Sequence, residues 1–93
     1  MQDELLLITL KQDLEILHSK NEEYLLQLIK VAKDMIAREG ITLGDSYEDQ
    51  ALVTMYAAWM YRKRASDENK MPRMLRASLN NKLFSQKAVD TDV

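Results

Sequence analysis

A helical repeat of apolar residues between Asn21 and Gly40 constrains the fold of this chain more than any other feature of its sequence. Apolar side chains recur there at steps of three and one residues, so one face of an α-helix is apolar and most charged side chains lie opposite. Asn21 is a preferred N-cap residue, and Gly40 suits the left-handed position that ends many helices. The pattern predicts a helix over residues 21–39, with an apolar face formed by Leu25, Leu28, Ile29, Ala32, Met35 and Ile36.

Three other segments carry helix signals of their own. Asp3 is a suitable N-cap for a first helix, in which leucines recur at steps of three and four. Ser46 and Asp49 have the spacing of a capping box at the start of a third helix, and Pro72 fits the first turn of a fourth. The ranges predicted for these helices are 3–17, 46–64 and 72–84.

The size of the chain limits it to one domain. It has 93 residues, of which 46% are hydrophobic, and this suffices for one core but not for two. We therefore predict an all-α protein with a compact four-helix single domain over residues 1–87 and a frayed polar tail over residues 88–93. The predicted core consists of Leu25, Leu28, Ile29, Ala32, Ile36, Leu52, Met55 and Trp59.

The sequence offers no recognisable catalytic, cofactor or metal site. It has no cysteine, and its one histidine, His18, has no second imidazole or thiolate to complete a metal site. Gly40 and Gly44 are the only glycines, so there is no glycine-rich phosphate loop. Paired carboxylates stand at the starts of predicted helices, where they stabilise the helix dipole. We expect no enzyme activity, no cofactor and no metal.

Membrane and secretion signals are also absent from the sequence. No apolar run approaches the roughly 18 residues that a membrane span needs. The first residues are acidic, whereas a secretory signal begins with basic ones. We expect no membrane contact and a cytoplasmic location.

Charge is distributed unevenly along the chain. Residues 1–61 contain 5 Lys and Arg against 11 Asp and Glu, a net charge of −6, whereas residues 62–87 contain 8 against 2, a net charge of +6. Such a chain can pair with a copy of itself, with an acidic partner or with nucleic acid. The alternative is that the two parts neutralise each other within one molecule.

The basic part contains the residues that we expect at a protein interface. Arg73 and Arg76 lie three residues apart on one helix face, where arginine forks suit carboxylates on a partner. Asn80 and Asn81 have poor helix propensity, so they either cap a turn or bond to a partner. Phe84 either fills a partner's pocket or covers the end of the bundle. The candidate interface residues are Arg62, Arg64, Arg73, Arg76, Asn80, Asn81 and Phe84.

Three aromatic residues, Tyr56, Trp59 and Tyr61, precede the basic run 62–64. In one interpretation they form a platform on which nucleic-acid bases stack. Tyr56 and Trp59 are three residues apart on an apolar helix, which favours the other interpretation, that Trp59 anchors the core.

Six blocks of the sequence form a pattern in their order and spacing. They read LEI at 14–16, EEYL at 22–25, IAREGI at 36–41, MYAAWMYRKR at 55–64, MPRMLR at 71–76 and LNN at 79–81. This pattern resembles the small head–tail connector proteins of long-tailed bacteriophages and prophages. The resemblance covers residues 5 to about 87, and the arrangement of the blocks is more specific than any one of them.

The resemblance implies an all-helical adaptor that forms a homo-oligomeric ring beneath the phage portal protein during head completion. It implies the portal and a downstream head–tail or tail protein as partners, with DNA only passing through the ring, and no active site. The implied location is the host cytoplasm during assembly and then the head–tail joint of the virion. Lysines and arginines in the lumen would grip phosphates, so we expect the acidic part to line it. The competing hypothesis is a small helical DNA-binding module that uses the basic segment 62–76.

Overall fold

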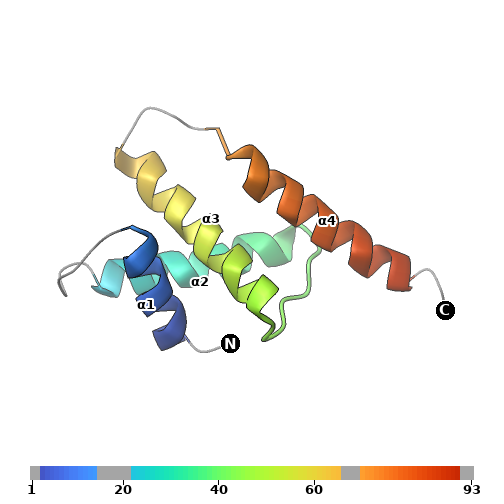
Figure 1. Ribbon diagram of the computed structural model, residues 1–93, viewed down its shortest axis with the longest axis horizontal. Coiled ribbons are helices and arrows are strands. Elements are labelled where there is room, and N and C mark those ends of the chain that lie inside the picture. The colour runs from blue at the N-terminus through green and yellow to red at the C-terminus, as the bar shows by residue number, and fades with distance from the viewer. Residues whose placement is uncertain (1–2, 15–21, 66–69, 91–93) are drawn as a thin grey trace.

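The computed structural model describes residues 3–14, 22–65 and 70–90. Across these ranges the chain forms four α-helices and no strand (Figure 1). This confirms the all-α, four-helix prediction, and each helix starts within one residue of its predicted position. The first helix is shorter than the predicted 3–17, because it ends at Asp13 and residue 14 forms a turn; residues 15–17 lie outside the described residues. The helices are α1 (Asp3–Asp13), α2 (Glu22–Arg38), α3 (Tyr47–Ala65) and α4 (Arg73–Asp90).

Helix α4 is longer than predicted. The prediction ended it at residue 84 and began a frayed tail at residue 88, but the helix continues to Asp90. Residues 87 and 88 are lysine and alanine, which favour helix, and the side chain of Gln86 is hydrogen-bonded to the connector before α3. Both properties extend the helix beyond its last leucine. Residues 91–93 of the predicted tail lie outside the described residues.

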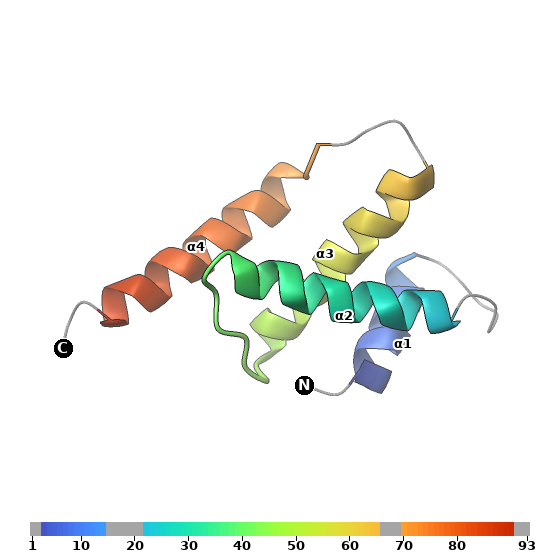
Figure 2. The same ribbon diagram turned by 180° about the vertical axis from the view of Figure 1, so that it is seen from behind.

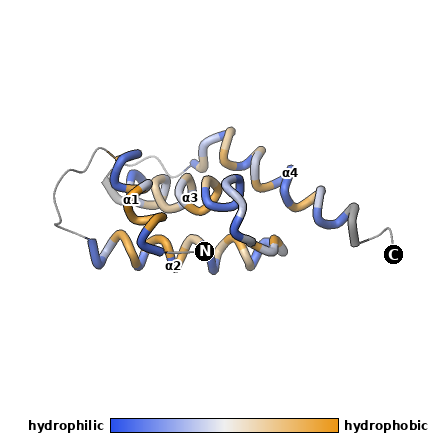
Figure 3. Tube along the Cα trace, turned by 60° about the horizontal axis from the view of Figure 1, so that its bottom comes forward, coloured by the Kyte–Doolittle hydropathy of each residue, from blue (hydrophilic) through white to orange (hydrophobic). Residues whose placement is uncertain are grey.

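Helices α1, α2 and α3 form the body of the molecule, and α4 packs mainly along α3. α1 crosses α2 at a steep angle (Figure 1), and the two helices are joined by two ion pairs, Lys33 with Asp3 and Lys11 with Glu22. The C-terminal end of α4 extends beyond the other helices in two opposite views (Figures 1 and 2), and the hydropathy-coloured trace shows the same projection (Figure 3). The chain is flat, with extents of 48 × 30 × 17 Å, and α4 exposes one of its sides as far as its side chains are described, from residue 73 to residue 87.

The core draws residues from all four helices. Six of the eight predicted core residues are buried, whereas Met55 and Trp59 are only half-buried, so their assignment to the core interior is corrected. α3 packs against three helices, and its buried positions include Val53, Tyr56 and Ala57, which were not among the predicted core residues. The buried apolar residues are Leu6, Leu10, Leu25, Leu28, Ile29, Ala32, Ile36, Ile41, Leu52, Val53, Tyr56, Ala57, Ala58, Leu75 and Leu79.

Gly40 ends α2 in the left-handed conformation that its position predicts. Its φ is +94°, and a Cβ atom built there would lie 3.4 Å from Leu83 Cδ1 of α4. A left-handed backbone is open to glycine but costs an L-residue with a β-carbon about 1–2 kcal/mol. The residue therefore turns the chain away from α2 and lets α4 approach.

Replacing Gly40 with alanine is expected to lower the free energy of unfolding by about 1–2 kcal/mol, measured by urea denaturation. Asparagine tolerates the left-handed region better, so Gly40→Asn serves as the matched variant and should lose less. Equal losses in the two variants would show that crowding against Leu83, and not backbone strain, sets the cost.

Candidate functional site

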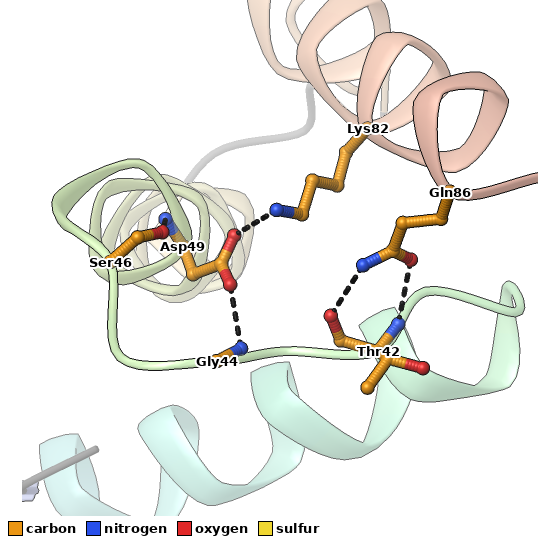
Figure 4. A network of polar contacts seen from close by, with 6 residues as sticks. All are labelled: Thr42, Gly44, Ser46, Asp49, Lys82 and Gln86. Carbon is orange, nitrogen blue, oxygen red and sulfur yellow. Dashed lines mark hydrogen bonds and ion pairs between the residues drawn. The ribbon is translucent and has the colours of Figure 1, made fainter. Parts of the chain in front are cut away.

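A buried ion pair joins the start of α3 to the C-terminal half of α4. Asp49 is 2% exposed, and Lys82 Nζ lies 2.8 Å from its Oδ1 (Figure 4). Asp49 Oδ2 accepts a hydrogen bond from the Gly44 N–H at 2.6 Å, and the Asp49 N–H donates to Ser46 Oγ at 3.1 Å. The predicted capping box is thus half formed: the serine caps the helix, while the carboxylate binds Gly44 N–H and the lysine.

The two charged groups of this pair stabilise each other's ionised form. Burial alone would raise the pKa of the Asp49 carboxyl group, but the hydrogen bonds and charge of Lys82 and the Gly44 N–H bring it below its usual value. The contact with Asp49 raises the pKa of the Lys82 ammonium group, although burial opposes this. Among the described residues, Asp49 Oδ1 has no partner other than Lys82. Its charge therefore depends on α4 being in place.

One turn further along α4, Gln86 binds the backbone of the connector between α2 and α3. Its Oε1 accepts from the Thr42 N–H at 2.9 Å, and its Nε2 donates to the Thr42 carbonyl at 2.7 Å (Figure 4). A side-chain amide that satisfies both polar groups of one residue replaces the pairing that a neighbouring strand would supply. Gln86 attaches the C-terminal half of α4 to the loop that precedes α3, and Lys82 attaches it to the first turn of α3.

Two of the predicted interface arginines are engaged within the chain. Arg76 reaches both carboxylate oxygens of Glu39, at 2.7 and 3.4 Å. Arg62 donates to Asp13 Oδ2 at 3.1 Å and to its backbone carbonyl at 3.3 Å. Both pairs, like Lys82 with Asp49, join the basic part of the chain to the acidic part. The structure thereby favours the interpretation in which the acidic and basic parts neutralise each other within one molecule. Arg76 and Arg62 already bind carboxylates of their own chain, so neither is free to bind a partner's carboxylate in this arrangement.

The outer face of α4 is the surface on which the remaining predicted interface residues lie. It consists of Arg73, Met74, Asn80, Asn81 and Phe84, all exposed and within about one-third of the helix circumference. Asn80 and Asn81 stand inside a helix that continues to Asp90, so the interpretation that they cap a turn is wrong. Phe84 is 66% exposed and does not cover the end of the bundle. The side chain of the remaining candidate, Arg64, lies outside the described residues.

The aromatic residues of α3 do not form an open stacking platform. Tyr56 is 4% exposed and stands edge-on to Trp59, with ring centroids 5.4 Å apart; burial and the charge of Glu39 raise its pKa. Tyr61 packs against Tyr24 of α2. Only Trp59 borders an opening, a pocket of about 280 Å³ between the second half of α3 and the start of α4.

Sequence reasoning did not identify Lys82 or Gln86. Both side chains lie on the inner face of α4, because they follow Leu75 and Leu79 at helical spacing. A lysine and a glutamine on an otherwise apolar face are the signal that could have found them, since buried polar groups require partners.

The described residues contain no group of three His, Cys, Asp or Glu side chains that could hold a metal ion. His18, which the sequence analysis considered for such a site, lies outside the described residues. None of the four helices, as far as they are described, combines the length and apolar character needed to cross a bilayer. Comparison of the chain with models of protein families, with curated proteins and with solved structures found no match.

Proposed function

We propose that this chain is a structural adaptor that self-associates into a ring, as a head–tail connector of a tailed bacteriophage or prophage. The partners in this proposal are further copies of the chain, the portal protein above the ring and a head–tail or tail protein below it. DNA passes through the ring, and the chain has no catalytic role. The place of action is the host cytoplasm during assembly, followed by the head–tail joint. The resemblance in the six sequence blocks supports the proposal.

The observation that carries the proposal is the outer face of α4. Met74 is 73% exposed and Phe84 is 66% exposed, on a helix that other contacts hold in place. Large exposed apolar side chains flanked by polar ones are typical of protein interfaces, and aromatic residues are frequent binding hot spots. Asn80 and Asn81 lie between them and supply hydrogen-bonding groups without charge. This face is therefore more favourably buried against another protein than exposed to solvent.

The alternative, a DNA-binding module that uses residues 62–76, receives less support. A phosphate-binding surface uses free cations, and two of the cations in this segment, Arg62 and Arg76, are instead paired with Asp13 and Glu39. Tyr56 is buried and cannot stack on bases. Acidic residues that pair with these arginines would also repel the phosphate backbone.

Sedimentation velocity over a concentration series tests the proposed function. The wild-type chain is expected to self-associate, and Phe84→Ser is expected to weaken association by about tenfold or more, because an aromatic anchor is removed from the interface. Tyr47→Ser is the matched control, since Tyr47 is 90% exposed on α3, away from the outer face of α4. It should associate like the wild type, and both variants should fold normally.

Binding of a short DNA duplex at several salt concentrations separates the two hypotheses. A wild-type chain that stays monomeric at millimolar concentration and binds DNA with a steep salt dependence would replace the adaptor proposal with the DNA-binding one. A chain that neither associates nor binds DNA or a portal protein would contradict both.

A further inference from the structure

The pocket between α3 and the start of α4 has an apolar base. Trp59, Leu75 and Ala58 contribute to its lining, and the last two are each 1% exposed, so they lie at its bottom. The Trp59 indole N–H donates to the Lys70 carbonyl at 3.2 Å, which fixes the ring at the side of the pocket. At about 280 Å³ the pocket has room for one or two aliphatic side chains. Such a surface binds an apolar group.

The opening of the pocket carries positive charge. Arg62, Lys63 and Lys70 line it and are exposed, and the Lys63 ammonium group lies 5.2 Å from the centre of the Trp59 ring. Asp13 is the one carboxylate in the lining, and Arg62 already binds it. Among the residues that the structure describes, neither Lys63 nor Lys70 is paired with a carboxylate. The pocket therefore fits a ligand that combines an apolar side chain with carboxylates.

We infer that this pocket binds residues 90–93 of a second copy of the chain. The segment reads Asp90-Thr91-Asp92-Val93, with two carboxylates within three residues and an apolar side chain next to them. In this arrangement the carboxylates pair with Lys63 and Lys70, and the valine enters the apolar base. The inference rests on the proposed self-association and supplies one of its contacts.

The segment of the same molecule cannot reach the pocket. Leu75 lies in the pocket and Asp90 lies fifteen residues further along the same straight helix, about 22 Å away. Three extended residues beyond Asp90 span at most about 11 Å, which is half of that distance. In Figure 1 α4 begins over the middle of the molecule and its other end projects beyond the remaining helices. The pocket and the segment can therefore meet only between copies.

A contact between two different surfaces has a consequence for the assembly. Each copy has one pocket and one acidic segment, so it binds one neighbour through its pocket and a second neighbour through its segment. Such a head-to-tail contact closes into a ring when the rotation between neighbours divides the circle, and otherwise continues as a filament. The end of α4 projects beyond the body, so a neighbouring copy can approach it.

Charge reversal on each side tests the inference. Asp90→Lys with Asp92→Lys reverses the segment, and Lys63→Glu with Lys70→Glu reverses the pocket; Arg62 is kept because it holds Asp13. Each double variant is expected to associate about tenfold or more weakly than the wild type in sedimentation velocity. A one-to-one mixture of the two variants is expected to recover association, because the lysines of one then face the glutamates of the other.

The matched control for the pocket variant is Lys30→Glu with Arg38→Glu. It also replaces two cations by two glutamates, but at exposed positions of α2. It should associate like the wild type. If either reversed variant associates as tightly as the wild type, or if the mixture fails to recover, the inference is wrong and the proposed function is unaffected.

A labelled peptide of residues 88–93 separates the inference from the proposed function. It is expected to bind the wild-type chain, to shift the Trp59 fluorescence, and not to bind the pocket-reversed chain. Peptide binding by a chain that never self-associates would support the pocket and contradict the proposed function. Self-association without peptide binding would contradict the inference alone. If the wild-type chain binds DNA but not the peptide, and the pocket-reversed chain no longer binds DNA, the pocket is a nucleic-acid site and the inference is wrong.

Discussion

Replacing Lys82 with methionine is expected to lower the free energy of unfolding by about 3 kcal/mol. The substitution removes the only described partner of Asp49 Oδ1 and leaves the carboxylate 3% exposed and uncompensated. Breaking a buried ion pair by removing one member typically costs about 3–5 kcal/mol. Because the Lys82 side chain is 19% exposed, we expect a cost at the lower end of this range. Urea denaturation followed by circular dichroism measures the change.

Two further variants show whether the uncompensated charge causes this loss. Lys30→Met makes the same substitution at an exposed position of α2 and should change stability by less than about 0.5 kcal/mol. Adding Asp49→Asn to Lys82→Met removes the buried charge, so the double variant should be more stable than Lys82→Met alone. A loss below about 1 kcal/mol for Lys82→Met would contradict the assignment of the pair to the interior.

The pH dependence of stability gives a second measurement on the same pair. The pKa of Asp49 is lower in the folded chain than in the unfolded one, so its contribution is complete above the ordinary aspartate pKa of about 3.9. The contribution is lost as the pH falls through the lowered, folded value. The stability difference between the wild type and Asp49→Asn should therefore shrink on acidification. A difference that stays constant in acid would show that the charge of Asp49 does not stabilise the fold.

The second large effect is expected from Leu79→Ala, at about 3 kcal/mol. Leu79 is fully buried and belongs to the apolar contact that attaches the first half of α4 to the body. Truncating a buried leucine removes its transfer free energy and leaves a cavity, with a usual total of about 2–5 kcal/mol. Leu5→Ala, at a position that is 52% exposed, is the matched control and should lose far less. Equal losses would show that α4 is not bound through its leucines.

The fold could be predicted where one helix face is apolar and the other is charged. α2 has this pattern, and its predicted core residues are buried, although Met35, predicted on the same apolar face, is 38% exposed. α3 lacks it, because apolar residues occupy most of its circumference and three helices surround it. Spacing alone could not decide between Trp59, which is half-buried, and Val53 or Tyr56, which are buried. The missing information was which neighbours cover each side.

The candidate site was predicted less completely than the fold. The exposed positions of Arg73 and Phe84 agree with their predicted role at an interface, which remains a prediction. The partners of Arg76 and Arg62 could not be predicted, because ion pairs between distant segments depend on how the helices pack. The acidic residues that bind them lie 37 and 49 positions earlier in the sequence. A charge pattern predicts that opposite charges will pair, but not whether they do so within a molecule or between molecules.

The two halves of α4 are held by different forces, and this affects how the helix opens. Leu75 and Leu79 hold its beginning by apolar burial, whereas Lys82 and Gln86 hold its end mainly through polar contacts with residues before and at the start of α3. Separating the end exposes little apolar surface, so it requires less free energy than global unfolding. Amide protons in the last two turns should thus exchange with solvent while those near Leu75 stay protected. The projecting end of α4 can therefore change its direction without disturbing the core.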